Sequence, residues 1–205
     1  MSAAPGTREV ASAARQEVIL AAALRLFNRQ GFAATSIDDL RKASGASVGS
    51  IYHHFGGKEG VAAELYVRAL RRYQQGVLDL VRENPAAREG IDGLVHHYLG
   101  WVAEHTDEAR YLLAMRSAEV LLASKKRVRS LNRDFFREVF GWLEAQADAG
   151  RIRKVPRHLY FPLVIGPSQE LVREWLEGRF DQDLEDAADL LADAAWYSIR
   201  EGDRE

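Results

Sequence analysis

The sequence predicts an all-α protein in which three short helices precede a larger helical part. Apolar residues recur at three- and four-residue spacing along most of the chain, which is the period of a helix with one buried face. No stretch alternates convincingly with the period of two that a half-buried strand shows. Glycines, prolines and short polar runs separate the periodic segments, as helix ends do.

The composition indicates a folded protein with a substantial core. The 205 residues are 47% hydrophobic and 28% charged, and the absence of cysteine excludes a disulfide framework and any thiolate metal site. No apolar stretch approaches the roughly 18 residues of a membrane span, and residues 1–15 hold no apolar signal-peptide core. We therefore expect a cytoplasmic protein with no membrane partner.

Charged and aromatic residues divide unevenly along the chain. Residues 1–75 carry 10 Lys and Arg against 6 Asp and Glu, whereas residues 76–205 carry 18 against 24. Only four of the 19 aromatic residues precede residue 58. A polyanionic partner is conceivable only for the first part, and the second must bury or bind with most of the aromatic rings.

The first helix is expected to begin at Arg15. Residues 1–14 are small and polar, and they predict a flexible lead-in. An apolar stripe then runs from Ile19 to Phe27, and Gly31 supplies a stop.

Two short helices follow. Thr35 and Ser36 are placed to cap a second helix that ends at Gly45, and Ser47 is placed to cap a third over residues 48–54. The connection between them is only a few residues long and contains glycine, which is typical of a helix-turn-helix.

Beyond residue 58 the pattern is helical throughout. The expected helical segments are 58–83, 86–105, 107–117, 124–149, 157–177 and 183–201. Pro162 and Pro167 fall inside one of them, so we expect a bent or broken helix there.

Residues 15–66 resemble the DNA-binding domain of the TetR family of transcriptional regulators. The matching features are an apolar helix ending in Phe27 and Gly31-Phe32, a capped helix after Thr35, Gly45 in the turn, the core Gly49-x-x-Tyr52-x-His54-Phe55, and Lys58. The resemblance implies a helix-turn-helix DNA-binding domain at 15–57 and a helical effector-binding and dimerisation domain at 58–205, with 58–83 as the connecting helix. It also implies a homodimeric repressor that a small-molecule effector releases from a near-palindromic DNA operator.

The residue types of the third helix suit contact with DNA. Short side chains and glycine let a helix approach base edges, while ring polar atoms and hydroxyls beside helix amino termini suit phosphate oxygens. The candidate base-facing residues are Val48, Gly49, Ser50 and His53, and the candidate phosphate-contacting residues are Thr35, Ser36, Ser47, Tyr52, His54 and Lys58. Outside such a motif the same tyrosine, histidines and lysine would be ordinary packing and surface residues.

The larger domain offers aromatic and polar residues for an effector pocket. The candidate ligand-binding residues are His97, Trp101, Tyr111, Met115, Arg116, Phe161, Gln169 and Trp175, with Tyr98 and Phe135 as further aromatic walls. An aromatic ring at helical spacing is more often a core residue than a pocket wall. Apolar stripes suited to a dimer interface, or to an intramolecular core, comprise Leu171, Trp175, Leu184, Ala188, Leu191, Ala195 and Ile199.

Enzymatic motifs find little support. Residues 45–49 match the G-x-S-x-G pattern with Ser47 as nucleophile, but that motif needs a preceding buried strand and the sequence offers a charged helix. His96-His97 and Glu104-His105 lack metal-ligand spacing. We expect no enzyme activity, cofactor or metal; the alternative function is a helical small-molecule-binding protein that does not bind DNA.

Overall fold

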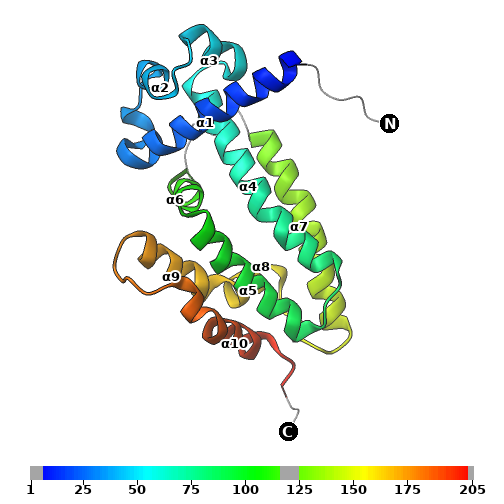
Figure 1. Ribbon diagram of the computed structural model, residues 1–205. Coiled ribbons are helices and arrows are strands. Elements are labelled where there is room, and N and C mark those ends of the chain that lie inside the picture. The colour runs from blue at the N-terminus through cyan, green and yellow to red at the C-terminus, as the bar shows by residue number, and fades with distance from the viewer. Residues whose placement is uncertain (1–6, 116–124, 203–205) are drawn as a thin grey trace. The chain divides into compact units, whose positions relative to one another are not determined.

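The computed structural model describes residues 7–115 and 125–202, and most of them are helical (Figure 1). The elements are α1 (Thr7–Ala34), α2 (Ile37–Ser44), α3 (Val48–Phe55), α4 (Lys58–Arg82), α5 (Ala87–Glu104), α6 (Thr106–Met115), α7 (Lys125–Asp148), α8 (Arg157–Val164), α9 (Gly166–Leu176), the 3-10 helix η2 (Leu184–Ala187) and α10 (Ala188–Ile199). The β pairing within these ranges is one isolated antiparallel bridge, between Ile152 and Arg200. The all-α prediction is confirmed.

The chain forms two compact units. Unit 1 comprises the described parts of residues 1–69 and 107–128, and unit 2 those of residues 70–106 and 129–205. The chain passes from one unit to the other within α4, at the start of α6 and within α7. This division differs from the boundary predicted after residue 57, because the first part of α4 and α6 both pack with the amino-terminal helices.

Unit 1 has a continuous apolar core. Its buried members come from α1 to α4, the turn before α3, and α6, and are Ile19, Leu20, Ala23, Leu26, Phe27, Leu40, Ala46, Ile51, Val61, Ala62, Leu65, Tyr111 and Met115. The Tyr111 ring stacks on Phe27 with 5.9 Å between centroids, and its hydroxyl donates a 2.8 Å hydrogen bond to the Ala62 carbonyl. A buried phenol with a satisfied hydroxyl is a stable core residue. The position of α6 therefore depends on long-range packing.

Side-chain caps and left-handed glycines fix the short connections of unit 1. Ser36 and Asp39 form a reciprocal capping box at the start of α2, and Gly45 closes that helix at φ 67°. Ser47 caps α3, and Gly56 closes it at φ 75°. These local signals explain why the two short helices lie within a residue of their predicted bounds.

α1 is longer than expected. It begins at Thr7 instead of Arg15, so residues 7–14 are helical and are not a flexible lead-in; residues 1–6 lie outside the described ranges. The stretch from Thr7 contains three alanines, the best helix former, and no helix breaker. Gly31 has non-helical angles (φ 81°, ψ 160°), so regular helix stops where the sequence predicts it.

Unit 2 is arranged around α5. Helices α8, α9, η2 and α10 each pack against α5, and α10 also packs against α8. The segment 157–177 is broken as its prolines predict, with α8 ending at Val164 and α9 starting at Gly166. Pro162 lies inside α8, and because proline has no N–H it leaves the carbonyl four residues earlier without its helical donor.

The apolar stripes predicted for a dimer interface belong to the interior of unit 2. The buried members are Leu184, Ala188, Ala195 and Ile199. The half-buried members are Leu171, Trp175 and Leu191. Their burial follows from the packing of α10 on α5 and α8, so the intramolecular alternative accounts for them. On α10 the large apolar side chains left exposed are Leu190 (73%) and Tyr197 (63%), seven residues apart on one helix face.

Candidate nucleic-acid interface and ligand cavity

α3 presents one face to the core and another to solvent. Ile51 is fully buried, and His54 and Phe55 are half-buried beside it. The outer face carries Val48 (40% exposed), Gly49, Tyr52 (53% exposed) and His53. These four positions share one side of a helix by their three- and four-residue spacing. The structure therefore brings three of the four predicted base-facing residues together with Tyr52, and Ser50 lies half-buried beside them.

The predicted hydroxyls of Ser36 and Ser47 are exposed at helix amino termini but already have partners. The Ser36 hydroxyl accepts from the Asp39 N–H at 3.1 Å and donates to the Asp39 carboxylate at 2.7 Å. The Ser47 hydroxyl accepts from the Ser50 N–H at 3.1 Å. Ser47 thus has a capping role, and the G-x-S-x-G pattern around it falls on a turn between helices and not on a strand-to-helix elbow.

Thr35 and Lys58, which the sequence predicts as phosphate contacts, both have hydrogen-bond partners within unit 1. Thr35 is 1% exposed, and its hydroxyl donates to the Gly31 carbonyl at 2.8 Å. The Lys58 ammonium donates to the carbonyls of Phe32 and Thr35 at 2.9 and 2.7 Å and lies 4.2 Å from the Phe32 ring centroid. Lys58 therefore donates to two carbonyls at the carboxyl end of α1, and that of Phe32 also accepts from the Thr35 N–H at 3.2 Å.

His54 also has a partner within unit 1. Its Nδ1 lies 3.5 Å from the Gln16 amide nitrogen on α1, and the side chain is half-buried. The structure thus places His54 at the side of α3 that meets α1, away from the outer face of Tyr52 and His53.

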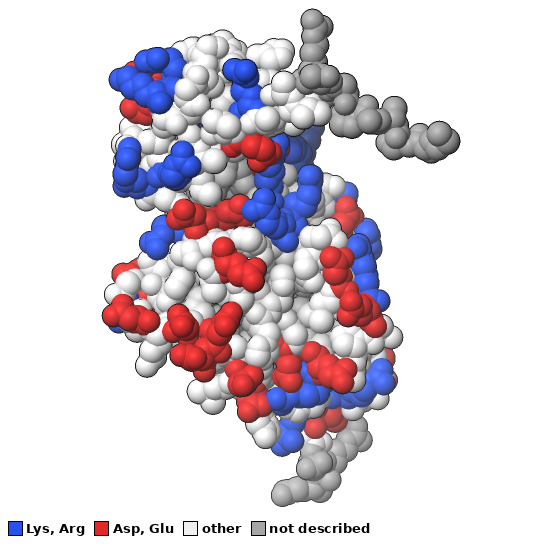
Figure 2. All heavy atoms as spheres, in the orientation of Figure 1, with Lys and Arg blue, Asp and Glu red and all other residues white. Residues whose placement is uncertain are grey.

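Sequence reasoning missed two cations next to α3. Arg41 and Lys42, in the last turn of α2, line a shallow open hollow with Gly45, Ser47 and other turn residues. Figure 2 shows cationic side chains gathered over α2 on the visible face. Both bind the Asp38 carboxylate at 2.7 Å, and these hydrogen bonds, that of Lys42 first, hold the pKa of Asp38 below its ordinary value. The sequence signal that could have identified Arg41 and Lys42 is their position at the carboxyl end of the second helix, directly before the turn.

Gly60 is a second residue that the sequence did not single out. A Cβ at this position would lie 1.6 Å from the Phe55 carbonyl oxygen, which is backbone and cannot give way. Only glycine lets the first turn of α4 approach the end of α3 this closely. Gly60 therefore helps to set the direction in which α3 leaves the core.

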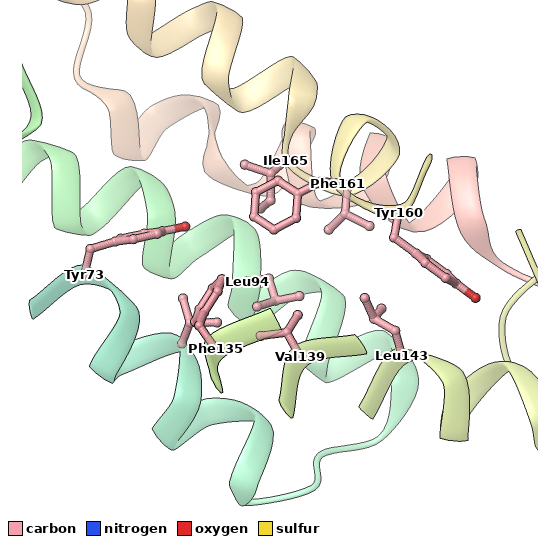
Figure 3. Close-up of a pocket in the computed structure, with 10 residues that line it drawn as sticks. Tyr73, Leu94, Phe135, Val139, Leu143, Tyr160, Phe161 and Ile165 are labelled. Carbon is pink, nitrogen blue, oxygen red and sulfur yellow. The ribbon is translucent and has the colours of Figure 1, made fainter. Parts of the chain in front are cut away.

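Unit 2 contains a small apolar cavity between α4, α5, α7, α8 and the α8–α9 junction. Its volume is about 20 Å³, and its lining residues are Tyr73, Val77, Leu94, Phe135, Val139, Leu143, Tyr160, Phe161, Val164 and Ile165 (Figure 3). That volume is room for roughly one water molecule. Burial raises the pKa of the Tyr73 phenol, which keeps it neutral as a hydrogen-bond donor.

The predicted ligand residues are dispersed, and Phe161 is the one that lines this cavity. Tyr111 and Met115 lie in the core of unit 1 because α6 packs there, and Arg116 lies outside the described residues. Trp101, Gln169 and Trp175 are in unit 2 but do not line the cavity. Phe135, named as a further aromatic wall, lines it, while Tyr98 does not.

His97 supports α4 and does not face the cavity. Its Nε2 lies 3.1 Å from the Tyr73 carbonyl oxygen, and its ring stacks on the Tyr73 ring at 5.6 Å. A Cβ on Gly76 would come within 2.2 Å of the His97 ring, so glycine makes room for it. Sequence periodicity could not reveal this pairing, because it joins two different helices.

The described residues contain neither a metal-binding cluster nor a membrane-spanning helix. No group of three or more His, Cys, Asp or Glu side chains in the described ranges is placed to hold a metal ion. In the same ranges, no helix is both long enough and apolar enough to cross a membrane.

Two short capped helices joined by a tight turn, the second with an exposed outer face, are the arrangement of a helix-turn-helix. Residues 19–65 match the model of the bacterial regulatory proteins of the tetR family. The curated relatives include the HTH-type transcriptional regulator LmrA of Bacillus subtilis, 40% identical over 82 residues, which are 39% of this chain and 43% of LmrA. The chain therefore spans less than half of LmrA.

A longer match extends the similarity into unit 2. The HTH-type transcriptional repressor Rv1474c of Mycobacterium tuberculosis is 30% identical over 139 residues, covering 61% of this chain and 70% of that protein. Among solved structures, the FadR regulator of Bacillus subtilis in complex with stearoyl-CoA superposes with a TM-score of 0.76 at 18% identity, over 90% of this chain and 98% of FadR. The chain belongs to the tetR family of bacterial regulatory proteins.

Proposed function

We propose that this regulator binds a DNA operator by placing α3 in the major groove. The observation that carries the proposal is the outer face of α3, where Val48, Gly49, Tyr52 and His53 are exposed on a helix fixed by caps at both ends. Small side chains and a glycine let the helix come close to base edges, which larger residues would prevent. The Tyr52 hydroxyl and the His53 ring add hydrogen-bonding groups at the margins of that face.

Arg41 and Lys42 supply the positive charge that α3 lacks. Cations beside the recognition helix neutralise phosphates and release counterions, which is the main source of affinity for DNA. Their position in the hollow next to Ser47 sets them beside the amino terminus of α3, where a phosphate is also favoured by the helix dipole. Asp38 holds both side chains until DNA replaces it.

Two copies of the chain would bind the two halves of a near-palindromic operator. Helix-turn-helix dimers place their recognition helices about 34–36 Å apart, one turn of DNA, so that both enter the same side of the duplex. The exposed Leu190 and Tyr197 on α10 give an apolar face for a second copy, and that face is the part of α10 its own fold leaves uncovered.

Unit 2 is the proposed effector-binding part, and effector binding releases the operator. The apolar cavity supports this assignment, since a ligand site in a helical unit is typically an apolar hollow between helices. FadR, a neighbour of the same fold, was solved with stearoyl-CoA, and Rv1474c is named a repressor. An effector that binds one state of the protein more tightly shifts the balance away from the DNA-binding state. No catalytic step is part of this proposal.

The DNA proposal is tested with two matched arginines. Arg41 and Arg137 each pair with an aspartate three residues earlier on an exposed helix, at 2.7 and 2.9 Å. In Arg41→Ala, operator affinity should fall about tenfold at low salt, and the slope of log affinity against log salt should shrink by about 1. Arg137→Ala should change neither quantity. Fluorescence anisotropy with an operator duplex selected from genomic DNA, at several salt concentrations, measures both.

The outcomes separate the two functional candidates. Equal effects of the two arginine substitutions would remove Arg41 from the interface. If wild-type protein binds every duplex weakly and equally, and a genome-wide selection yields no preferred site, the result favours a ligand-binding protein without an operator.

A further inference from the structure

The cavity of unit 2 has one polar group directed into it. Figure 3 shows the Tyr73 ring entering from α4 with its hydroxyl toward Phe161 and Ile165, while the Tyr160 hydroxyl points away from the other lining side chains. The Tyr73 ring contacts the rings of His97 and Trp101, at 5.6 and 5.4 Å between centroids. A hydroxyl that faces an apolar cavity gains from any ligand that offers it a hydrogen bond.

The other nine lining side chains restrict the rest of the ligand. None of the nine carries a charge, and eight are hydrocarbon or phenyl groups. An ion placed among them would lose its hydration without gaining a counter-ion, so a charged group inside the cavity is strongly disfavoured. The surroundings favour a hydrocarbon body with a single neutral oxygen.

One wall of the cavity comes from a short helix that contains a proline. Tyr160, Phe161 and Val164 come from α8, a helix of eight residues that contains Pro162 and ends two residues before Gly166. A helix with a missing backbone hydrogen bond is displaced more easily than the uninterrupted α7 opposite. Since the closed cavity has room for about one water, a larger ligand must displace this wall.

We infer that the cavity binds an uncharged, mainly hydrocarbon molecule whose single oxygen meets the Tyr73 hydroxyl, and that α8 moves outward to admit it. This inference rests on the proposed effector-binding role of unit 2 and names the chemical class of that effector. Tyr73 acts as the polar anchor, and the ring of Phe161 closes the unoccupied site.

Isothermal titration of the full chain with 1-decanol, decanoate and decylamine at pH 7.5 tests the ligand class. The three probes share a chain length and differ in the charge of the head group. Decanol should bind at least tenfold more tightly than either ion. Tyr73→Phe should weaken decanol about tenfold, equivalent to about 1.4 kcal/mol, and Tyr98→Phe in the same aromatic cluster should leave its affinity unchanged.

A second pair of variants tests the moving wall. Phe161 and Phe140 both pack on Phe136, at 5.7 and 5.5 Å between ring centroids, but only Phe161 lines the cavity. Phe161→Ala leaves the site already open, so decanol should bind several-fold more tightly, whereas Phe140→Ala should have no effect. Phe161→Leu replaces Phe161→Ala if the latter does not fold.

The results distinguish this inference from the proposed function. Equal affinity for the three probes, or a Tyr73→Phe protein that binds decanol normally, overturns the ligand class even if operator binding is intact. If wild-type protein binds decanol as expected but binds no operator, the result contradicts the DNA proposal alone.

Discussion

The two units use the same kind of helix for opposite purposes. Unit 1 has a net charge of +4, closes its short helices with caps and glycines, and leaves an ordered face exposed. Unit 2 has a net charge of −6, holds most of the aromatic residues, and surrounds a nearly filled cavity with a proline-interrupted wall. A surface that meets a fixed duplex gains from rigidity, whereas a ligand site must open. Local sequence signals specify the exposed face of unit 1, whereas packing between helices specifies the cavity of unit 2.

The largest expected effect comes from adding one methyl group to a glycine in each unit. Gly60→Ala drives a Cβ into the Phe55 carbonyl and should destabilise unit 1 by at least about 3 kcal/mol. Gly141→Ala, on an exposed part of α7 with nothing within 4 Å of the added Cβ, should stabilise unit 2 by about 0.5–1 kcal/mol. Urea denaturation with hydrogen exchange resolved by unit measures both. Equal changes of the same sign would contradict the close α3–α4 approach.

A smaller effect separates folding from DNA contact within unit 1. Lys58→Ala leaves two carbonyls without their charged donor and should cost about 2 kcal/mol of stability. Operator affinity per folded molecule should remain near wild type. Tyr52→Ala should instead leave stability unchanged and weaken operator binding about tenfold, because the ring is exposed on the outer face of α3.

Thermal unfolding and anisotropy on the same samples check this pair of variants. A Lys58→Ala protein that is fully stable but defective in operator binding would place Lys58 at the DNA interface.

The smallest expected effect concerns pH. Burial of Glu64 opposes its ionisation, but hydrogen bonds from Arg68 and Arg127 outweigh it, so the pKa of Glu64 lies below its ordinary value of 4.5. A lowered pKa in the folded state gives stability that is present above about pH 4.5 and is lost as the pH falls through the folded value. The contribution at neutral pH should be less than about 1 kcal/mol.

The measurement is the urea midpoint of wild type and Glu64→Gln at pH 7 and pH 3.5. The gap between the two proteins should narrow at the lower pH. Glu138→Gln in unit 2 breaks the more exposed pair with Arg82 and should show a smaller gap. A gap for Glu64→Gln that is constant with pH would exclude ionisation as its cause.

Much of unit 1 could be predicted from the sequence. Helix ends at Ser36, Gly45 and Ser47 depend on residues within a few positions of each other, so spacing reveals them. The hydrogen bonds of Lys58 could not be predicted in this way. They join its ammonium to the carbonyls of Phe32 and Thr35, more than 20 positions earlier, and depend on how α4 packs against the end of α1.

In unit 2, packing between helices decides more of the candidate site than local sequence signals do. Its helices and the break around Pro162 could be predicted, but Phe161 is the one predicted ligand residue that lines the cavity. An aromatic residue at helical spacing has the same pattern whether it faces a cavity, the core of its own unit or another unit. Tyr111 illustrates this, since its ring lies against Phe27 of unit 1, 84 positions earlier in the chain.

The sequence by itself determined the all-α class, the order and approximate bounds of the helices, and the exposed face of α3. Each depends on periodicity or on contacts between near neighbours in the chain. The tertiary structure alone decided that α6 belongs with unit 1, that Lys58 caps α1, and that Tyr73 directs its hydroxyl into the cavity. Those three features join residues far apart in sequence, and their position follows from which helix faces pack together.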